Sequence, residues 1–243
     1  LPWTPPFVVE FRQLRFNQTG KVANASILAN ARPEPEFTKA IEACGGKVYA
    51  VFFGGGSLGS WTNELAVMTP WPSVEALARA GPVVAEQFSN LQSTTAERLV
   101  PTARPTDARS LYELQCATGN PTIYAHRWFY LDDADWDEYV QLSNGAWPSM
   151  EGREYGPAKG TVTIQGFFKS LDEPRPSAKV LLLTRYSSLA CWEESRVIRP
   201  GNANAGGADE KAFKRRNEIT NLSSVFPMAL VSWPRRGGSK GKL

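Results

Sequence analysis

The chain has 243 residues, which is enough for one large domain or two ordinary ones. Its content of 42% hydrophobic and 21% charged residues is typical of a globular protein and excludes a disordered, collagen-like or coiled-coil protein. The net charge of +3 is small, and the aromatic residues lie inside apolar segments, so nucleic acid is not expected as a partner.

The sequence also bears on the compartment of the protein and on its association with membranes. The longest apolar runs, Val180 to Leu183 and Met228 to Val231, are far too short to cross a bilayer, and the N-terminal residues do not have the charged-then-apolar pattern of a leader. Three cysteines, without a CxxC pair, suggest neither a disulfide framework nor a zinc knuckle. We therefore expect a cytoplasmic protein without a membrane partner.

The first half of the chain predicts strands and helices in alternation. A strand over Val8 to Phe16 precedes a helix that carries Phe37 and Ile41 and ends at Gly45-Gly46. Further strands are expected at Val48 to Phe53 and Glu64 to Thr69. A helix capped by Ser73 and another near Ala85 to Leu91 complete this half.

The second half follows the same order. Ile123 to Leu131, rich in aromatic and β-branched residues, predicts a strand, and Asp133 caps the helix that follows. The remaining expected elements are a hairpin from Thr161 to Phe168 and Lys179 to Arg185, a Ser188-capped helix through Arg196, a helical segment from Asp209 and a strand over Val225 to Val231.

Short segments recur in the same order at a spacing near 115 residues. Phe52-Phe53 returns as Phe167-Phe168, and the first strands and last strands of the halves can be aligned with each other. We therefore expect two repeats, over residues 1–114 and 115–233, followed by a disordered basic tail over 234–243.

Each half reads βαββαβ, which is the ferredoxin-like arrangement of an antiparallel sheet with helices on one face. Two such units can cover each other's open faces and close into a barrel. On the segments Val48 to Phe53, Leu65 to Ala78, Thr161 to Phe168 and Val180 to Glu193, the chain resembles the dimeric α/β-barrel superfamily in its fused, two-repeat form, with a particular likeness to NIPSNAP-type domains. The fold class expected is α+β, an intrachain dimeric α/β barrel of two tandem repeats.

Strand alternation selects candidate catalytic residues. Aligning Glu10 to Phe16 with Tyr124 to Tyr130 brings one set of side chains from each first strand toward a shared cavity. His126, the only histidine, can exchange a proton near neutral pH. The expected catalytic residues are His126, Arg12, Glu10 and Tyr124. The alternative to a catalytic role is a structural one, in which His126 is a hydrogen-bonded histidine of a strand and Glu10 and Arg12 form ion pairs at the surface.

Aromatic residues on the strands favour a flat or aromatic ligand in this cavity, although many of them also suit a packed core. The expected substrate-binding residues are Trp128, Tyr130, Phe16, Gln165, Thr184, Tyr186 and Trp71. The glycine-rich Gly54 to Ser60 lacks the lysine and helix start of a phosphate loop and predicts a hairpin loop instead. No metal site is expected, because one histidine and the spacing of the acids match no metal motif.

The resemblance implies a cofactor-independent enzyme that acts on a small hydrophobic, aromatic molecule, since this superfamily includes isomerases, lyases and monooxygenases. A lyase or an isomerase is favoured over an oxygenase, because proton transfer is the chemistry that these residues can perform. Arg12 would stabilise developing negative charge, and Tyr124 or Glu10 would orient the substrate or relay a proton. Two alternatives stay open: a haem enzyme resembling chlorite dismutase, and a non-catalytic protein that binds a small molecule or packs shut. The expected state is a monomer with a pseudo-dimeric barrel, or a homodimer.

Overall fold

The computed structural model describes residues 7–17, 35–54, 64–80, 83–86, 91–104, 123–157, 159–196 and 208–230. Several expectations fall outside these residues: the loop after Gly54, the boundary between residues 114 and 115 and the tail over 234–243.

Eight strands form one closed antiparallel barrel in the order β1-β3-β2-β8-β5-β7-β6-β4. The strands are β1 (Val8–Phe16), β2 (Ala50–Phe53), β3 (Glu64–Trp71), β4 (Leu91–Arg104), β5 (Ile123–Asp132), β6 (Val162–Ser170), β7 (Ser177–Tyr186) and β8 (Leu222–Leu230). Closure removes the unpaired edges that an open sheet would expose.

Within this barrel the first four strands lie in the order 4-1-3-2, and so do the last four. β2 pairs with β8 on one side, and β4 pairs with β6 on the other. The α+β class and the antiparallel sheet are therefore as expected from the sequence. Each half contributes half of the barrel wall.

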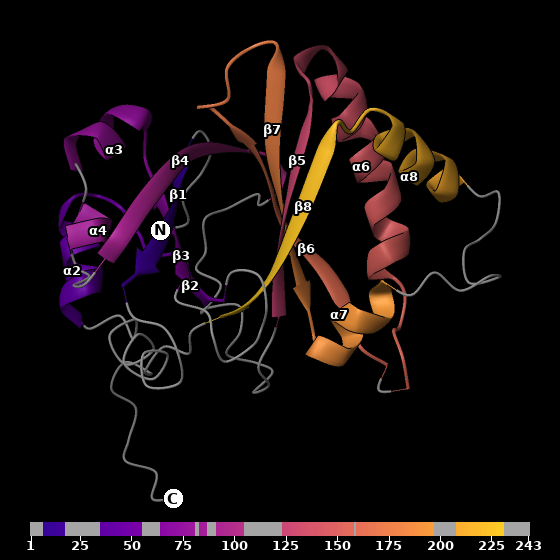
Figure 1. Ribbon diagram of the computed structural model, residues 1–243, viewed down its shortest axis with the longest axis horizontal. Coiled ribbons are helices and arrows are strands. Elements are labelled where there is room, and N and C mark those ends of the chain that lie inside the picture. The colour runs from indigo at the N-terminus through magenta and orange to yellow at the C-terminus, as the bar shows by residue number, and fades with distance from the viewer. Residues whose placement is uncertain are drawn as a thin grey trace, which may run out of the picture.

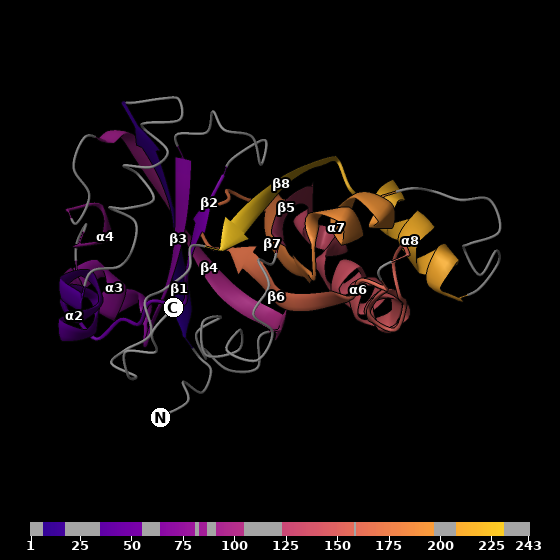
Figure 2. The same cartoon turned by 90° about the horizontal axis from the view of Figure 1, so that it is seen from below.

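The helices lie outside the strands (Figure 1). They are α2 (Pro35–Ala43), α3 (Val74–Ala80) and α4 (Val83–Glu86) on the first half, and η1 (Asp133–Asp135), α6 (Trp136–Glu151), α7 (Leu189–Ser195) and α8 (Ala208–Glu218) on the second. Figure 2 shows strands of both halves in the centre, with the two helical groups at opposite ends of the molecule.

Local sequence signals set the ends of several helices. Gly45 adopts a φ of 83°, and the amide of Gly46 donates to the Ile41 carbonyl after α2 ends. The Ser73 hydroxyl accepts from the Ala76 amide, and the Ser188 hydroxyl accepts from the Cys191 amide. The two serine caps lie where the sequence predicts them. Asp133, expected as a cap, lies within η1 instead, and Asp135 precedes α6 without a capping hydrogen bond from its side chain.

The segment before residue 104 differs from the expectation. In the described residues, the helix expected near residues 85–91 is represented by α4, and β4 extends over 14 residues from Leu91 to Arg104. The first part of β4 is a mostly polar run that pairs with β1 from Val9 to Phe16. Tertiary pairing, which a local pattern does not contain, therefore determines this strand.

The two faces of the barrel wall bury different apolar clusters. The inner cluster combines residues of both halves, including Phe11, Phe52, Trp128 and Phe168. One outer cluster lies beneath α2 and α3, and two further outer clusters lie beneath α6 and α7. The inner cluster is therefore the contact between the halves.

We expect Gly166→Ala to destabilise the protein by about 1–3 kcal/mol, because overpacking a filled core forces side chains to shift. A Cβ at Gly166 would lie 2.2 Å from Cε2 of Phe168, which is fully buried. Urea unfolding measures the change. Gly145→Ala in α6 is the control, since a Cβ there meets nothing within 4 Å and should stabilise by about 0.5–1 kcal/mol. Equal stability of Gly166→Ala and wild type would contradict the packing described.

Candidate functional site

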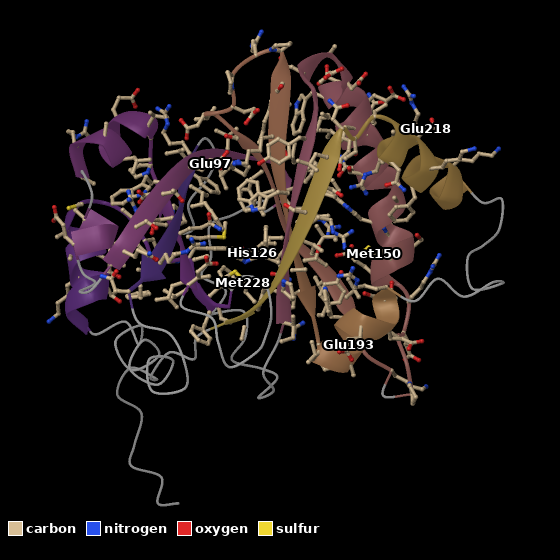
Figure 3. All side chains as sticks on the ribbon, in the orientation of Figure 1. Glu97, His126, Met150, Glu193, Glu218 and Met228 are labelled. Carbon is tan, nitrogen blue, oxygen red and sulfur yellow. The ribbon has the colours of Figure 1, made fainter. Side chains whose placement is uncertain are left out.

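Four aromatic residues of β5 alternate along its inner face. Tyr124 and Trp128 belong to the inner cluster, Tyr130 packs against it, and His126 lies between Tyr124 and Trp128. Side chains two apart on a strand share a face, so the spacing of these residues places all four inside the barrel. Figure 3 shows His126 near the middle of the molecule, between the two groups of strands.

His126 is enclosed completely. It is 1% exposed, and neither Nδ1 nor Nε2 has a hydrogen-bond partner. Burial lowers the pKa of His126 to about 3, because an imidazolium would lose its hydration there. At neutral pH the side chain is therefore a neutral imidazole with one free donor and one free acceptor.

Aromatic rings from the first half pack against the edges of His126. The centroid of the Phe52 ring lies 4.4 Å from the centroid of the imidazole, and that of the Phe11 ring lies 5.5 Å from it. Both ring pairs are T-shaped. Phe11 also contacts Trp128 at 5.2 Å, and Phe52 contacts Tyr124 at 5.2 Å. The imidazole thus lies where the two halves meet.

An ion pair lies beyond Trp128 on the inner face. Lys179 of β7 binds Glu97 of β4, and its ammonium lies 4.6 Å from the Trp128 ring centroid and 5.7 Å from that of Tyr130. Burial disfavours the Lys179 cation, but the neighbouring Glu97 carboxylate outweighs this effect and raises the pKa of Lys179. Lys179 is therefore a cation separated from His126 by one aromatic side chain.

Glu10 and Arg12 lie on the opposite face from the one expected. They bind each other on the outer side of β1, where Val8 and Leu14 pack into the outer cluster. Burial raises the pKa of Glu10, and the Arg12 guanidinium opposes this rise. The alignment of Glu10 with Tyr124 has an even offset of 114 residues, whereas inner residues of β1 are odd-numbered and those of β5 even-numbered. A slip of one residue moves every side chain to the other face of the sheet.

The remaining expected ligand-binding residues divide in the same way. Trp128 and Tyr130 point inward. Phe16 and Trp71 pack in the outer cluster of the first half, and Tyr186 in an outer cluster of the second. Thr184 shares the outer face with Tyr186, and Gln165 lies half-buried at an irregularity of β6 between Ile164 and Gly166.

Phe11, Phe52, Glu97 and Lys179 form part of the inner site but were not among the expected site residues. Neighbouring residues of a strand face opposite sides of the sheet. The expectation that Glu10 and Arg12 point inward therefore implied that Phe11, which lies between them, points outward. Glu97 and Lys179 are 82 residues apart and meet only through barrel closure. The inward face of β1 could have been recognised from Val9 and Phe11, because these apolar residues align with the aromatic residues of β5 when the offset between the two strands is odd.

The residues around His126 do not fit haem. An axial histidine needs an open position beside its nitrogen for iron and the porphyrin plane, whereas rings and aliphatic side chains enclose this imidazole. Among the described residues, no group of three or more His, Cys, Asp or Glu side chains could hold a metal ion. None of the helices in the described ranges is both long enough and apolar enough to span a membrane.

Neither a family model nor a curated protein matches the sequence. Solved structures resemble the fold over nearly the whole chain. An anthrone oxidase-like protein has a TM-score of 0.59 at 10% identity, covering 96% of this chain and 94% of that one. A provisionally assigned monooxygenase from Lactobacillus acidophilus NCFM has a TM-score of 0.53 at 10% identity, with 93% and 94% covered.

A chlorite dismutase variant from Candidatus Nitrospira defluvii has a TM-score of 0.51 at 10% identity, covering 92% of this chain and 91% of that one. At such low identity these similarities describe the fold alone. The fold is that of the dimeric α/β barrel, with its ferredoxin-like antiparallel sheet.

Proposed function

We propose that this protein is an enzyme that binds a small aromatic molecule inside the barrel and moves a proton with His126. One observation carries the proposal: the only histidine is buried among aromatic rings with both ring nitrogens unpaired. Leaving a buried polar group without a partner costs free energy. A ligand with a hydroxyl or an acidic proton would supply the missing hydrogen bond.

The neutral imidazole defines the step. Its unprotonated nitrogen accepts a proton from an activated C–H or a phenolic O–H of the ligand, leaving an anion beside an imidazolium. Return of the proton to another atom gives an isomerisation, and loss of a leaving group from the anion gives a lyase reaction. The fold similarity to an anthrone oxidase-like protein supports an aromatic substrate, because the methylene of an anthrone loses a proton to form an aromatic oxyanion.

We assign stabilisation of the developing negative charge to Lys179 rather than Arg12. Lys179 lies over Trp128 on the inner face, whereas Arg12 lies on the outer face. Tyr124, the next inward residue below His126, is proposed to orient the ligand through its ring, which contacts Phe52. No cofactor is required by this scheme.

The common strand order of the halves supports an origin by duplication, with repeats over residues 1–114 and 115–233. In that case the barrel is an intrachain counterpart of a dimer and a monomer can carry the complete site. The NIPSNAP-type likeness and a cytoplasmic location remain predictions from the sequence.

A second candidate is a barrel without catalytic activity. The inner side chains around His126, including Phe11, Phe52, Met68 and Met228, are all buried and form one apolar cluster. Such a cluster also suits a core that holds the halves together. Binding and proton-exchange measurements distinguish this candidate from the enzyme.

Binding of 2-naphthol and of naphthalene tests the proposed hydrogen bond. We expect His126→Leu to weaken 2-naphthol binding about tenfold and to leave naphthalene binding within about threefold, because only the hydroxyl can bond to the imidazole. Isothermal titration calorimetry measures both ligands.

Ile164→Val on the outer face is the control and should bind like wild type. The proposal is overturned if wild type binds neither ligand, or if His126→Leu weakens both ligands equally.

A further inference from the structure

Arg216 of α8 is a buried guanidinium without a carboxylate partner among the described residues. It is 5% exposed and lies over the rings of Tyr139, Phe213 and Phe129, at 4.9, 5.8 and 5.5 Å from their centroids. Burying a cation is costly unless an anion or acceptors compensate it. The aromatic faces supply part of this compensation.

The Nε and Nη2 edge of a guanidinium binds carboxylates elsewhere in this protein. Four other guanidiniums use Nε and Nη2 together on one carboxylate: Arg12 on Glu10, Arg15 on Glu64, Arg98 on Asp172 and Arg215 on Glu138. In Arg216, Nη2 donates to the Tyr139 hydroxyl at 3.0 Å, and the buried Nε has no acceptor. Only one of the two nitrogens of this edge therefore has an acceptor in Arg216.

A second cation lies on the same side of the second half. Arg127 of β5 alternates with Ala125 and Phe129, which pack in outer clusters, so it faces outward. Phe129, the next outward residue of β5, lies 5.6 Å from the Tyr139 ring and 5.5 Å from the Arg216 guanidinium. Arg127 therefore lies one outward position along β5 from the residue that contacts both, and its charge also opposes the burial that raises the pKa of Tyr139. Arg127 makes no ion pair with any other described residue.

The sequence offers little to neutralise this pair. The segment 197–207, which joins α7 to α8, contains neither Asp nor Glu. Three donor groups of described residues lie here: Nε of Arg216, the guanidinium of Arg127 and the Tyr139 hydroxyl, which also interacts with Thr220. Such a set of donors suits an oxyanion.

We propose that Arg216, Arg127 and Tyr139 bind the phosphate group of a small ligand between α6, α8 and the outer face of β5. A phosphate dianion balances two guanidiniums, and its oxygens match the Nε and Nη2 edge in a bidentate way. The surrounding rings exclude water and strengthen the contact. β5 separates this site from the barrel interior, since Arg127 and His126 are consecutive residues on opposite faces, so the proposal is independent of the proposed catalytic step.

Inorganic phosphate is the probe. Isothermal titration calorimetry and thermal unfolding compare potassium phosphate, potassium acetate and potassium chloride at equal ionic strength. We expect saturable phosphate binding in wild type with a matching rise in melting temperature, and at least a tenfold loss of phosphate affinity in Arg216→Gln and in Arg127→Gln. Tyr139→Phe should retain folding and weaken phosphate binding by a smaller factor.

Arg215→Gln is the matched control, because Arg215 is adjacent in sequence, exposed and bound to Glu138. It should bind phosphate like wild type. If Arg216→Gln fails to fold, the half-buried Arg127→Gln variant decides the result. Absence of phosphate binding in wild type overturns the proposal, and so does unchanged affinity in Arg127→Gln or equal saturation by acetate.

Discussion

Replacing His126 with alanine is expected to slow deuterium uptake into the methylene group of anthrone by roughly 10²–10⁴-fold, the range that a general base contributes. The neutral imidazole is the only described inner side chain with a free nitrogen acceptor, so its loss removes the proposed base. Exchange returns a solvent deuteron to the same carbon and requires no oxidant. Proton NMR under anaerobic conditions therefore isolates the proton-transfer step.

The pH profile of this exchange provides an independent readout. Since burial lowers the pKa of His126 to about 3, its base form is complete throughout pH 5–8, and the exchange rate should be flat there. An exposed histidine base would lose rate below about pH 6.5. Ile164→Val should behave like wild type. An unchanged exchange rate in His126→Ala would remove the base assignment, and a wild-type rate equal to that in buffer alone would favour the non-catalytic barrel.

Acid should destabilise the folded protein strongly through the same residue. The unfolded chain binds a proton at His126 below about pH 6.5, whereas the folded protein does so only below about pH 3. Between these values the unfolded state carries more protons, so the free energy of unfolding falls as the pH falls. The loss from His126 alone reaches about 4 kcal/mol at pH 3 and becomes small above pH 6.5.

Urea unfolding at pH 7, 5 and 4 measures this loss, with His126→Leu as the comparison. The variant lacks the titrating group, so its stability should fall less between pH 7 and pH 4. Glu10 does not imitate the effect, because burial raises the pKa of Glu10 and its contribution to stability therefore increases as the pH falls. Parallel pH dependence of wild type and His126→Leu would contradict the buried neutral imidazole.

Much of the architecture was accessible from local patterns. Ser73 and Ser188 cap helices where expected, Gly45 ends α2, and the aromatic alternation from Tyr124 to Tyr130 predicts β5. These signals act within a few residues, so one sequence suffices to detect them. The N-terminal part of β4 escaped prediction because its mostly polar run from Gln92 to Arg98 has no strand periodicity and forms a strand only through pairing with β1.

The candidate site was predicted for one half only. The inward position of His126, Tyr124 and Trp128 agrees with the expectation, but Glu10 and Arg12 lie on the other face. The error lies in the even offset that paired Glu10 with Tyr124, and not in β5, whose outer face carries Arg127. Its outward position is now part of the proposed phosphate site.

The order of amino acids alone determined β5 with its single histidine, the end of α2 and the serine caps of two helices, because each depends on neighbours in the chain. The N-terminal part of β4 depended on its pairing with β1. Closure of the barrel decided which face of β1 meets β5 and brought Glu97 to Lys179 across 82 residues. Strand periodicity of two makes the choice of face depend on a register difference of one residue, and only contacts between distant strands resolve it.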